Sequence, residues 1–494
     1  MGSLADYLDK GASLGRAAPC LVEGELTLSY GDVQLLSYKV AGALERDGVE
    51  PGAKVGILSS NDAFAFACVF GIARRGAVWC PINPRNEMAE NRALLELFDC
   101  ECLLYHRSYA EMAAQLPIAN KVCLDDLQDW LGEPGGAAPP VDDLAMLVGT
   151  GGTTGLPKGV MLTSRNLETM TAMTLVGYPF AGRPAYLALA PLTHAAGVLC
   201  FPVMARGGRI VVMPKPDVGA FIANIEQHRI THTFLPPTLI YMLLAHEATA
   251  AADFSSLQCF WYGAAPMSTA RLEEALTKIG PVMAQLFGQT EAPMMVSMLP
   301  PSEHFNADGS VAAARLASAG RAAPLVTVAI MDPDSGRLLP TGERGEIVVR
   351  SSLVMAGYYK NPEATAAASK HGWHHTGDVG YLDEDGYLFI VDRLKDMIIS
   401  GGFNVYSAEV EQALMAHPAV KDCAVVGLPD EKWGERVTAV IEAGSDVAPE
   451  ELIAFVKQRV GSVKAPKQLE VWEELPRSKV GKVLKAEVRS VLLR

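Results

Sequence analysis

The chain has 494 residues, of which 49% are hydrophobic, and its formal net charge is −14. This length predicts two or more folded domains rather than one. The acidic balance argues against a general nucleic-acid or anionic-membrane surface, because both need clustered Lys and Arg. A phosphate ligand would therefore have to be met locally, by backbone N–H groups, a metal ion or a few placed cations.

The nine cysteines are scattered and odd in number, and the closest pair, Cys100 and Cys102, has neither zinc-ligand nor redox spacing. We interpret them as reduced, mostly buried thiols of a cytoplasmic protein. The first ten residues carry acids and no apolar core, so they do not predict a signal peptide. The most apolar early stretch, residues 64–79, contains Arg74 and Arg75, which argues against a membrane-spanning helix.

Short β-rich segments alternate with helical patterns in the first half of the chain. The expected strand and helix pairs are 55–60 with 65–76, 146–150 with 165–173, 209–214 with 219–228, and 231–237 with 239–248. This alternation predicts an α/β fold of parallel-rich sheets wrapped by helices. Residues 132–140 are rich in Gly and Pro and predict a surface linker.

Closely spaced short strands follow after Val328, and Asp385-Gly386 supplies a tight turn between two of them. These strands, expected within 327–340, 345–351 and 381–393, predict a small β subdomain. Beyond Asp392 the pattern is mixed, with expected helices at 407–415 and 449–460 and expected strands at 423–426 and 438–441. About a hundred residues is a suitable size for a small α+β domain.

The strongest local signal is the glycine-rich segment at residues 150–159, TGGTTGLPKG, which follows an expected strand. Glycines allow the backbone to approach a charged ligand, and successive N–H groups form a concavity that binds anions. Threonine hydroxyls and the Lys158 ammonium add further donors. The segment therefore predicts a phosphate site, although its spacing is not that of a Walker P-loop. A flexible Gly-Thr turn is the alternative interpretation.

Four further segments are informative only in combination. They are 286–291 (LFGQTE), 373–378 (WHHTGD), 392–404 (DRLKDMIISGGFN) and 476–482 (PRSKVGK). Their order and spacing, with the glycine-rich segment, resemble the adenylate-forming superfamily of acyl-CoA synthetases, peptide-synthetase adenylation domains and luciferase-like enzymes. The resemblance covers nearly the whole chain. It implies a large N-terminal domain of parallel-rich sheets with a β subdomain, and a small mobile α+β C-terminal domain.

The resemblance implies Lys482, Glu291 and Thr150 as catalytic residues. Lys482 would meet the acid carboxylate and the bridging oxygen during adenylation, because an ammonium stabilises charge that builds on that oxygen. Glu291 would ligate Mg²⁺, which prefers carboxylate and phosphate oxygens. Asp378 would accept hydrogen bonds from the ribose hydroxyls of ATP, with Arg393 beside it. The residues implied for ATP binding are Thr150, Gly151, Gly152, Thr153, Thr154, Gly155, Lys158, Gly263, Ala264, Ala265, Phe287, Gly288, Thr290, Asp378 and Arg393.

Two of these residues also have an ordinary interpretation when they are taken singly. Asp378 is compatible with a turn-forming Asp, and Lys482 is compatible with a solvated lysine in a basic stretch. The joint pattern favours the functional interpretation of both.

The implied reaction has two steps at one site. The acid carboxylate attacks the α-phosphate of ATP to give an acyl-adenylate and pyrophosphate, and a thiol then displaces AMP. The C-terminal domain would rotate between the steps about Lys395, so we expect domains at 1–392 and 397–494 with a hinge at 393–396. After the rotation, a tunnel for coenzyme A would be lined by Gly401, Gly402, Trp433 and Gly434, since glycines allow close backbone approach.

Residues 191–197, PLTHAAG, align with the segment that gates the acid pocket in acyl- and aryl-CoA ligases. His194 is compatible with packing at the pocket mouth or with an acid/base role. Ala195 and Ala196 are small, so we expect a hydrophobic acid, either aromatic of the hydroxycinnamic type or a medium-chain fatty acid. The residues implied for this pocket are His194, Ala195, Gly197, Tyr262, Gly263 and Gly288.

Other functions stay open at this stage. An amino-acid adenylation domain would need an acid in residues 191–197 to pair with the substrate ammonium, and that segment has none. An acyl-AMP ligase that loads a separate carrier protein, or a non-catalytic adenylate-binding protein, would share the motifs. The expected ligands are a small carboxylic acid, ATP, coenzyme A and Mg²⁺, without nucleic acid or membrane insertion. A homodimer and the identity of the acid are left open.

Overall fold

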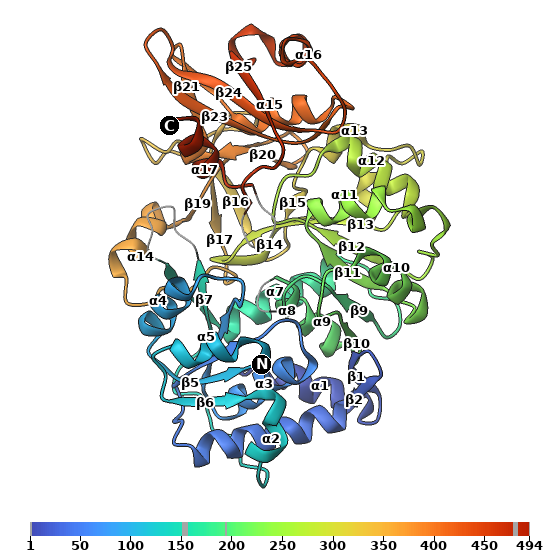
Figure 1. Cartoon of the computed structure of the whole chain (residues 1–494), viewed down its shortest axis with the longest axis vertical. Helices are drawn as coiled ribbons and strands as arrows, with labels where there is room; N and C mark the ends of the chain where they lie inside the picture. The colour runs from blue at the N-terminus through green and yellow to red at the C-terminus, as the bar shows by residue number, and fades with distance from the viewer. Residues whose placement is uncertain (1, 151–156, 193–194, 478–482, 494) are drawn as a thin grey trace.

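A computed structural model describes residues 2–150, 157–192, 195–477 and 483–493 (Figure 1). The described residues form four β-sheets. Two larger sheets with their helices make the N-terminal part, a smaller sheet follows, and the fourth sheet lies at the C-terminal end of the molecule (Figure 1).

The first sheet has the strand order β18-β8-β7-β4-β3-β5-β6. Strands β3 to β7 are mutually parallel, while β8 and β18 are antiparallel to their neighbours. Its strands are β3 (Lys54–Leu58), β4 (Val78–Ile82), β5 (Cys100–Tyr105), β6 (Asn120–Cys123), β7 (Leu144–Thr150), β8 (Lys158–Thr163) and β18 (Gly357–Tyr358). Every residue of β4 is buried, as expected for a central parallel strand that is covered on both faces.

The second sheet has the order β15-β14-β13-β12-β11-β9-β10-β1-β2 and is parallel from β1 to β13. Its strands are β1 (Pro19–Glu23), β2 (Leu26–Ser29), β9 (Ala185–Ala188), β10 (Arg209–Val212), β11 (His232–Leu235), β12 (Cys259–Tyr262), β13 (Met283–Gln289), β14 (Ala292–Leu299) and β15 (Arg321–Ala322). Strand β1 pairs with β10, which lies far along the chain.

Helices cover both sheets on both faces. One layer packs between the sheets, a second covers the outer face of the first sheet, and a third covers the outer face of the second sheet. The inner layer contains α1 (Ala5–Gly15), α2 (Tyr30–Arg46), α3 (Ala63–Arg74), α7 (Ser164–Gly177) and α9 (Cys200–Ala205). The outer layers contain α4 (Met88–Phe98) and α5 (Ala110–Gln115) on the first sheet, and α10 (Val218–Gln227), α11 (Pro237–Ala245) and α12 (Thr269–Lys278) on the second.

Helix starts follow local capping chemistry. Ser29 and Asp32 form a reciprocal capping box at the start of α2, and Thr163 and Asn166 form another at the start of α7. The Asp62 carboxylate accepts the Ala65 N–H at the start of α3. The shorter helices are α6 (Leu127–Trp130), α8 (Ala195–Val198), α13 (Ala313–Leu316) and α14 (Pro362–Ala368).

The third sheet is antiparallel with the order β16-β17-β19-β20, as the closely spaced strands predicted. Its strands are β16 (Thr327–Met331), β17 (Gly345–Arg350), β19 (His374–Leu382) and β20 (Leu388–Arg393). The ordinary interpretation of Asp378 as a turn-forming Asp does not hold, because Asp378 lies within β19, which starts at His374.

The residues from Ile398 onward build their own sheet and their own cores. This part contains β21 (Ile398–Ser400), β22 (Phe403–Val405), α15 (Ser407–Met415), β23 (Val420–Asp430), β24 (Gly434–Ala443), α16 (Pro449–Lys464), β25 (Gln468–Trp472) and α17 (Lys485–Leu492). The short helix η6 (Leu394–Asp396) joins it to β20. The domain boundary and the hinge at 393–396 stay predictions.

The cysteines are free thiols, all of them buried except the half-buried Cys123. Burial raises the pKa of Cys68 and Cys200 above the ordinary thiol range, which keeps both thiols protonated at neutral pH. Within the described parts of the chain, no helix combines the length and the hydropathy that a membrane span requires.

Helices α2 and α3 approach each other closely at Gly71. A Cβ atom added at Gly71 would lie 2.4 Å from the Cβ of Val40, so even one methyl group would force the two helices apart. We expect Gly71→Ala to lower the free energy of unfolding by about 2 kcal/mol, despite the higher helix propensity of alanine. Thermal unfolding followed by circular dichroism would measure this loss.

Gly219 in α10 provides the matched control, since a Cβ there would meet its nearest atom at 3.5 Å, an ordinary contact distance. Gly219→Ala should leave the unfolding temperature unchanged or raise it slightly. Equal effects of the two substitutions would contradict the steric explanation.

Candidate active site

The two ends of the glycine-rich segment lie side by side in the first sheet. Thr150 is the last residue of β7, Lys158 is the first residue of β8, and the two are paired across the hairpin. The Thr150 hydroxyl donates a hydrogen bond to the Lys158 carbonyl at 3.4 Å. The two described ends of the predicted phosphate segment therefore meet at one end of the first sheet.

Thr290 and Glu291 form the two-residue turn between β13 and β14 of the second sheet, closed by the pairing of Gln289 with Ala292. Gly288 precedes this turn, where a Cβ would lie 2.4 Å from the Met294 nitrogen. Only glycine fits that position without a shift of the backbone. The turn thus displays a hydroxyl and a carboxylate at the edge of the sheet.

Tyr358 connects this turn to the first sheet. The Tyr358 hydroxyl donates to the Glu291 Oε1 atom at 2.8 Å, and the Lys158 Nζ atom lies 4.9 Å from the centre of the Tyr358 ring. Burial and the Glu291 carboxylate raise the pKa of Tyr358, so the phenol stays a hydrogen-bond donor. Lys158 and Glu291, both predicted site residues, therefore contact the same tyrosine side chain.

Gln289 connects the second sheet to the third. Its side-chain amide donates hydrogen bonds of 2.7 Å to the Asp378 Oδ2 atom and to the Thr376 carbonyl. The other carboxylate oxygen of Asp378 lies 2.9 Å from the Nε atom of Arg393. Asp378 is buried while Arg393 is 42% exposed, so a fixed carboxylate lies beside an accessible cation.

These contacts bring three sheets together at one place. The β7–β8 hairpin, the β13–β14 turn and strands β19 and β20 each contribute side chains. Strands β14, β17 and β19 lie near the middle of the molecule in Figure 1. The site combines a cation, an exposed guanidinium, hydroxyls and two carboxylates, a set suited to a nucleotide triphosphate and a hard cation.

Sequence reasoning missed three residues of this site, namely Gln289, Tyr358 and His374. Gln289 lies inside the segment LFGQTE, so its neighbours indicated its place but not its partners. His374 is 5% exposed, and its Nε2 atom has no hydrogen-bond partner among the described residues. Burial lowers the pKa of His374, which makes it a neutral imidazole near Glu291.

The segment 262–265 follows β12. The Tyr262 side chain is fully buried and its hydroxyl lies 3.0 Å from the His304 Nε2 atom, so the side chain belongs to the core under the segment. A Cβ at Gly263 would lie 2.4 Å from the Leu286 carbonyl. Ala264 is exposed with a φ of 66°, while Ala265 is half-buried. Ala264, with part of Ala265, is therefore the accessible part of this segment, whereas Gly263 is buried.

The four residues predicted for the coenzyme A tunnel lie together on the C-terminal part. The Gly401 N–H donates to the Trp433 carbonyl at 2.7 Å, and Ser400 pairs with Gly434. Gly401 and Gly402 have φ values of 60° and 80°, and both residues are exposed. Strand β21 before them lies at the outer end of the C-terminal part, on the side away from β14 (Figure 1). Lys395 is exposed on η6.

Some predicted site residues lie outside the described residues, and their roles stay predictions. They are Gly151, Gly152, Thr153, Thr154, Gly155, His194 and Lys482. The side chain of Ala195 is likewise outside the description. Gly197 in α8 is buried, and a Cβ there would collide with the Leu192 carbonyl. Phe287 is half-buried and packs against the cores beside β13.

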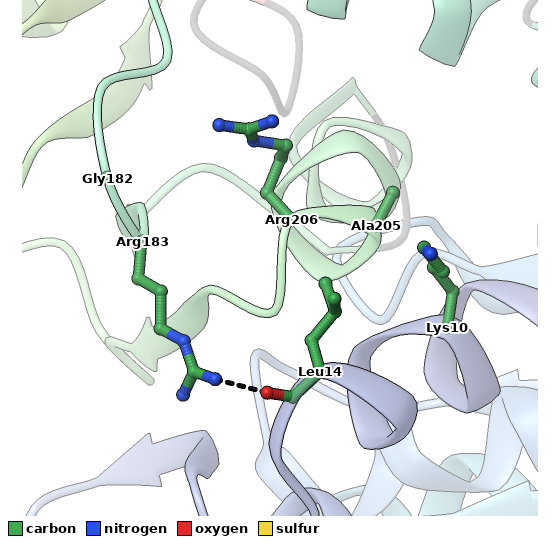
Figure 2. A pocket seen from close by; sticks show the side chains of 6 residues that line it. All are labelled: Lys10, Leu14, Gly182, Arg183, Ala205 and Arg206. Carbon is green, nitrogen blue, oxygen red and sulfur yellow. Dashed lines mark hydrogen bonds between the residues drawn. The ribbon is translucent and has the colours of Figure 1, made fainter.

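A second group of cations lines a surface hollow between α1 and α9, where Lys10, Arg183 and Arg206 are exposed. Figure 2 shows their charged ends pointing in different directions, with Arg183 bonded to the Leu14 carbonyl. The three cations do not converge on a common point, so the hollow does not form a second anion site.

Comparison with known proteins identifies the family. Residues 8–359 match the family model described as AMP-binding enzyme, and residues 409–482 match the AMP-binding enzyme C-terminal domain. The chain is 36% identical to a medium/long-chain-fatty-acid–CoA ligase of Mycobacterium tuberculosis, over 96% of this chain and 87% of that protein. It is 37% identical to a feruloyl-CoA synthase of an Amycolatopsis species, over 97% and 96% of the two chains.

Among solved structures, the amide bond synthetase McbA from Marinactinospora thermotolerans superposes with a TM-score of 0.91 at 30% identity, covering 99% of both chains. The matches to both family models extend across the N-terminal sheets and the C-terminal part. The chain therefore belongs to the AMP-binding enzymes, within the acyl-CoA synthetase branch of the adenylate-forming superfamily.

Proposed function

We propose that the protein is an AMP-forming ligase that activates a hydrophobic carboxylic acid with ATP and transfers the acyl group to coenzyme A. The observation that carries this proposal is the meeting of Lys158, Glu291 and Asp378 with their partners at the junction of three sheets. Membership of the family does not by itself show where a nucleotide would bind. This junction has hydrogen-bond donors and acceptors suited to the phosphates and the ribose of a nucleotide.

In the first step a carboxylate oxygen of the acid bonds to the α-phosphorus, and the bond to pyrophosphate breaks. Thr150, Lys158 and the glycine-rich segment would hold the phosphates by their N–H, hydroxyl and ammonium donors. Asp378 would accept the ribose hydroxyls, since Gln289 and Arg393 already hold its carboxylate in place. Lys482 would stabilise the charge on the bridging oxygen.

Mg²⁺ fits the Glu291 side of the site. The Glu291 carboxylate is a hard oxygen ligand, and Tyr358 orients it through a single hydrogen bond. When bound, Mg²⁺ supplies positive charge against the phosphates. The described residues contain no group of three or more His, Cys, Asp or Glu side chains able to hold a metal alone, so the phosphates would complete its coordination.

In the second step the thiol sulfur bonds to the acyl carbon and AMP leaves with the electron pair. Gly401 and Gly402 are exposed and directly follow β21, which lies away from β14 in Figure 1, and this supports an orientation in which the C-terminal part serves the first step. A rotation about the predicted hinge at Lys395 would then bring the tunnel residues to the adenylate.

The acid is proposed to be hydrophobic, either aromatic of the hydroxycinnamic type or medium-chain aliphatic. Two observations support this class. The gate segment 191–197 has no acid to pair with a substrate ammonium, and two compared relatives are named for medium- to long-chain fatty acids and for ferulate.

Pyrophosphate release from ATP and Mg²⁺ tests the proposal, measured with hydroxycinnamic acids, benzoic acids and C4 to C16 fatty acids. Each acid is assayed with coenzyme A, with an acyl carrier protein, with an amine, and without an acceptor. We expect rapid release with coenzyme A and one class of hydrophobic acid. Turnover only with the carrier protein or only with the amine would identify that molecule as the acyl acceptor. If no acid caused pyrophosphate release, the result would favour a non-catalytic adenylate-binding protein.

A further inference from the structure

A polar network connects the two sides of the predicted hinge. Asp392 is at the end of β20, before the hinge, and its Oδ2 atom accepts hydrogen bonds from the N–H and the hydroxyl of Ser407, the first residue of α15. The distance from the Ser407 hydroxyl oxygen is 2.7 Å. Both side chains are buried. The network thus starts from one buried carboxylate that faces the C-terminal part.

Lys485 continues this network inside the C-terminal part. Its Nζ atom donates to the Ser407 hydroxyl at 2.6 Å and lies 2.8 Å from the Glu411 carboxylate, one helical turn along α15. The Lys485 side chain is 21% exposed and the Glu411 side chain 18% exposed. Burial opposes the charge on Lys485, but the Glu411 and Asp392 carboxylates hold its pKa above the ordinary value.

Lys485 lies three residues after Lys482, the predicted catalytic lysine. Arg477 and Val483 are bridged, and the Leu484 N–H donates to the Pro476 carbonyl at 2.8 Å, so the chain on both sides of 478–482 is held together. Lys485 follows immediately as the first residue of α17. It is therefore the first polar side chain after Lys482 in the sequence.

We propose that Lys485 is a positioning residue, which ties α17 through Ser407 to Asp392 across the predicted hinge and so favours the domain orientation used for adenylation. This proposal rests on the proposed two-step function. A rotation at 393–396 that carries α15 away from β20 separates Ser407 from Asp392, whereas the Lys485–Glu411 pair lies within the C-terminal part and is preserved. The Asp392–Ser407–Lys485 network, here called the hinge lock, therefore forms in one domain orientation only.

The test compares two variants with a control. Ser407→Ala removes the hydroxyl that connects Lys485 to Asp392, and Lys485→Met with Glu411→Gln removes both charges of the Lys485–Glu411 pair together. Arg489→Met is the control, because Arg489 lies one turn along α17 and bonds to the Gly427 carbonyl and Glu435 instead. Lys485→Arg keeps the charge and should retain most of the wild-type rate of pyrophosphate release.

Two measurements are made on the full-length enzyme. We expect both variants to lower the rate of acid-dependent pyrophosphate release about tenfold, while transfer from preformed acyl-adenylate to coenzyme A changes less than about threefold. Hydrogen exchange of the amides at 393–407 should accelerate about tenfold in both variants and stay unchanged in Arg489→Met. Equal losses in both half-reactions, or unchanged exchange in both variants, would overturn the proposal. If the wild-type enzyme activates no acid, the proposed function fails, and the exchange experiment still decides whether Lys485 locks the hinge.

Discussion

Replacing Lys482 by alanine is expected to slow acid-dependent pyrophosphate release by about 10²- to 10³-fold, because one charge-stabilising donor at a reacting oxygen contributes roughly 3 to 4 kcal/mol. Transfer of the acyl group from a preformed acyl-adenylate to coenzyme A should stay within about threefold of the wild-type rate, because the proposed mechanism uses the lysine in the first step alone. The two half-reactions are measured separately, with radiolabelled pyrophosphate exchange and with release of AMP from the synthetic adenylate.

Lys479→Ala is the matched control, since Lys479 lies in the same basic segment and is not implied in catalysis. Its adenylation rate should stay close to that of the wild type. A Lys482→Ala enzyme that adenylates at the normal rate would show that Lys482 is an ordinary solvated lysine. Acetylation of Lys482 removes the same charge, so the acetylated enzyme should share the loss in the first half-reaction only.

Local patterns predicted much of the fold, because the elements concerned are defined by near neighbours in sequence. The helix expected at 407–415 has those bounds in α15, and the expected strands of the third sheet form antiparallel pairs. The helix expected at 449–460 continues to Lys464, with Gly461 at a φ of 80° as a kink. The linker at 132–140 contains no helix or strand, yet it is attached to α2 through the Gly135 N–H and the Tyr38 carbonyl.

Pairings between distant residues could not be predicted in the same way. Strand β1 joins the second sheet beside β10, and nothing in residues 19–23 identifies that partner. The active-site contacts could not be predicted for the same reason, because they also join residues that are far apart in the sequence. Tyr358 and Glu291 are 67 residues apart, and Gln289 and Asp378 are 89 residues apart. Motifs indicated Glu291 and Asp378 individually, whereas their partners depend on how three sheets meet.

The second large effect is expected at Asp378. Asp378→Asn keeps the shape of the side chain but removes the charge, and its amide hydrogens face the donors of Gln289 or Arg393. If Asp378 holds the ribose hydroxyls, the substitution should raise the KM for ATP about 10- to 100-fold with a smaller change in kcat, because the hydrogen bonds exist in both the ground state and the transition state.

Steady-state kinetics with ATP varied at saturating acid and coenzyme A measures this split. Glu384→Ala is the control, since Glu384 is an exposed carboxylate in the turn after β19. An unchanged KM for ATP in Asp378→Asn would mean that the carboxylate serves only to join the second and third sheets through Gln289. A loss of kcat alone would instead place Asp378 in the domain rotation, where Arg393 next to the hinge is its partner.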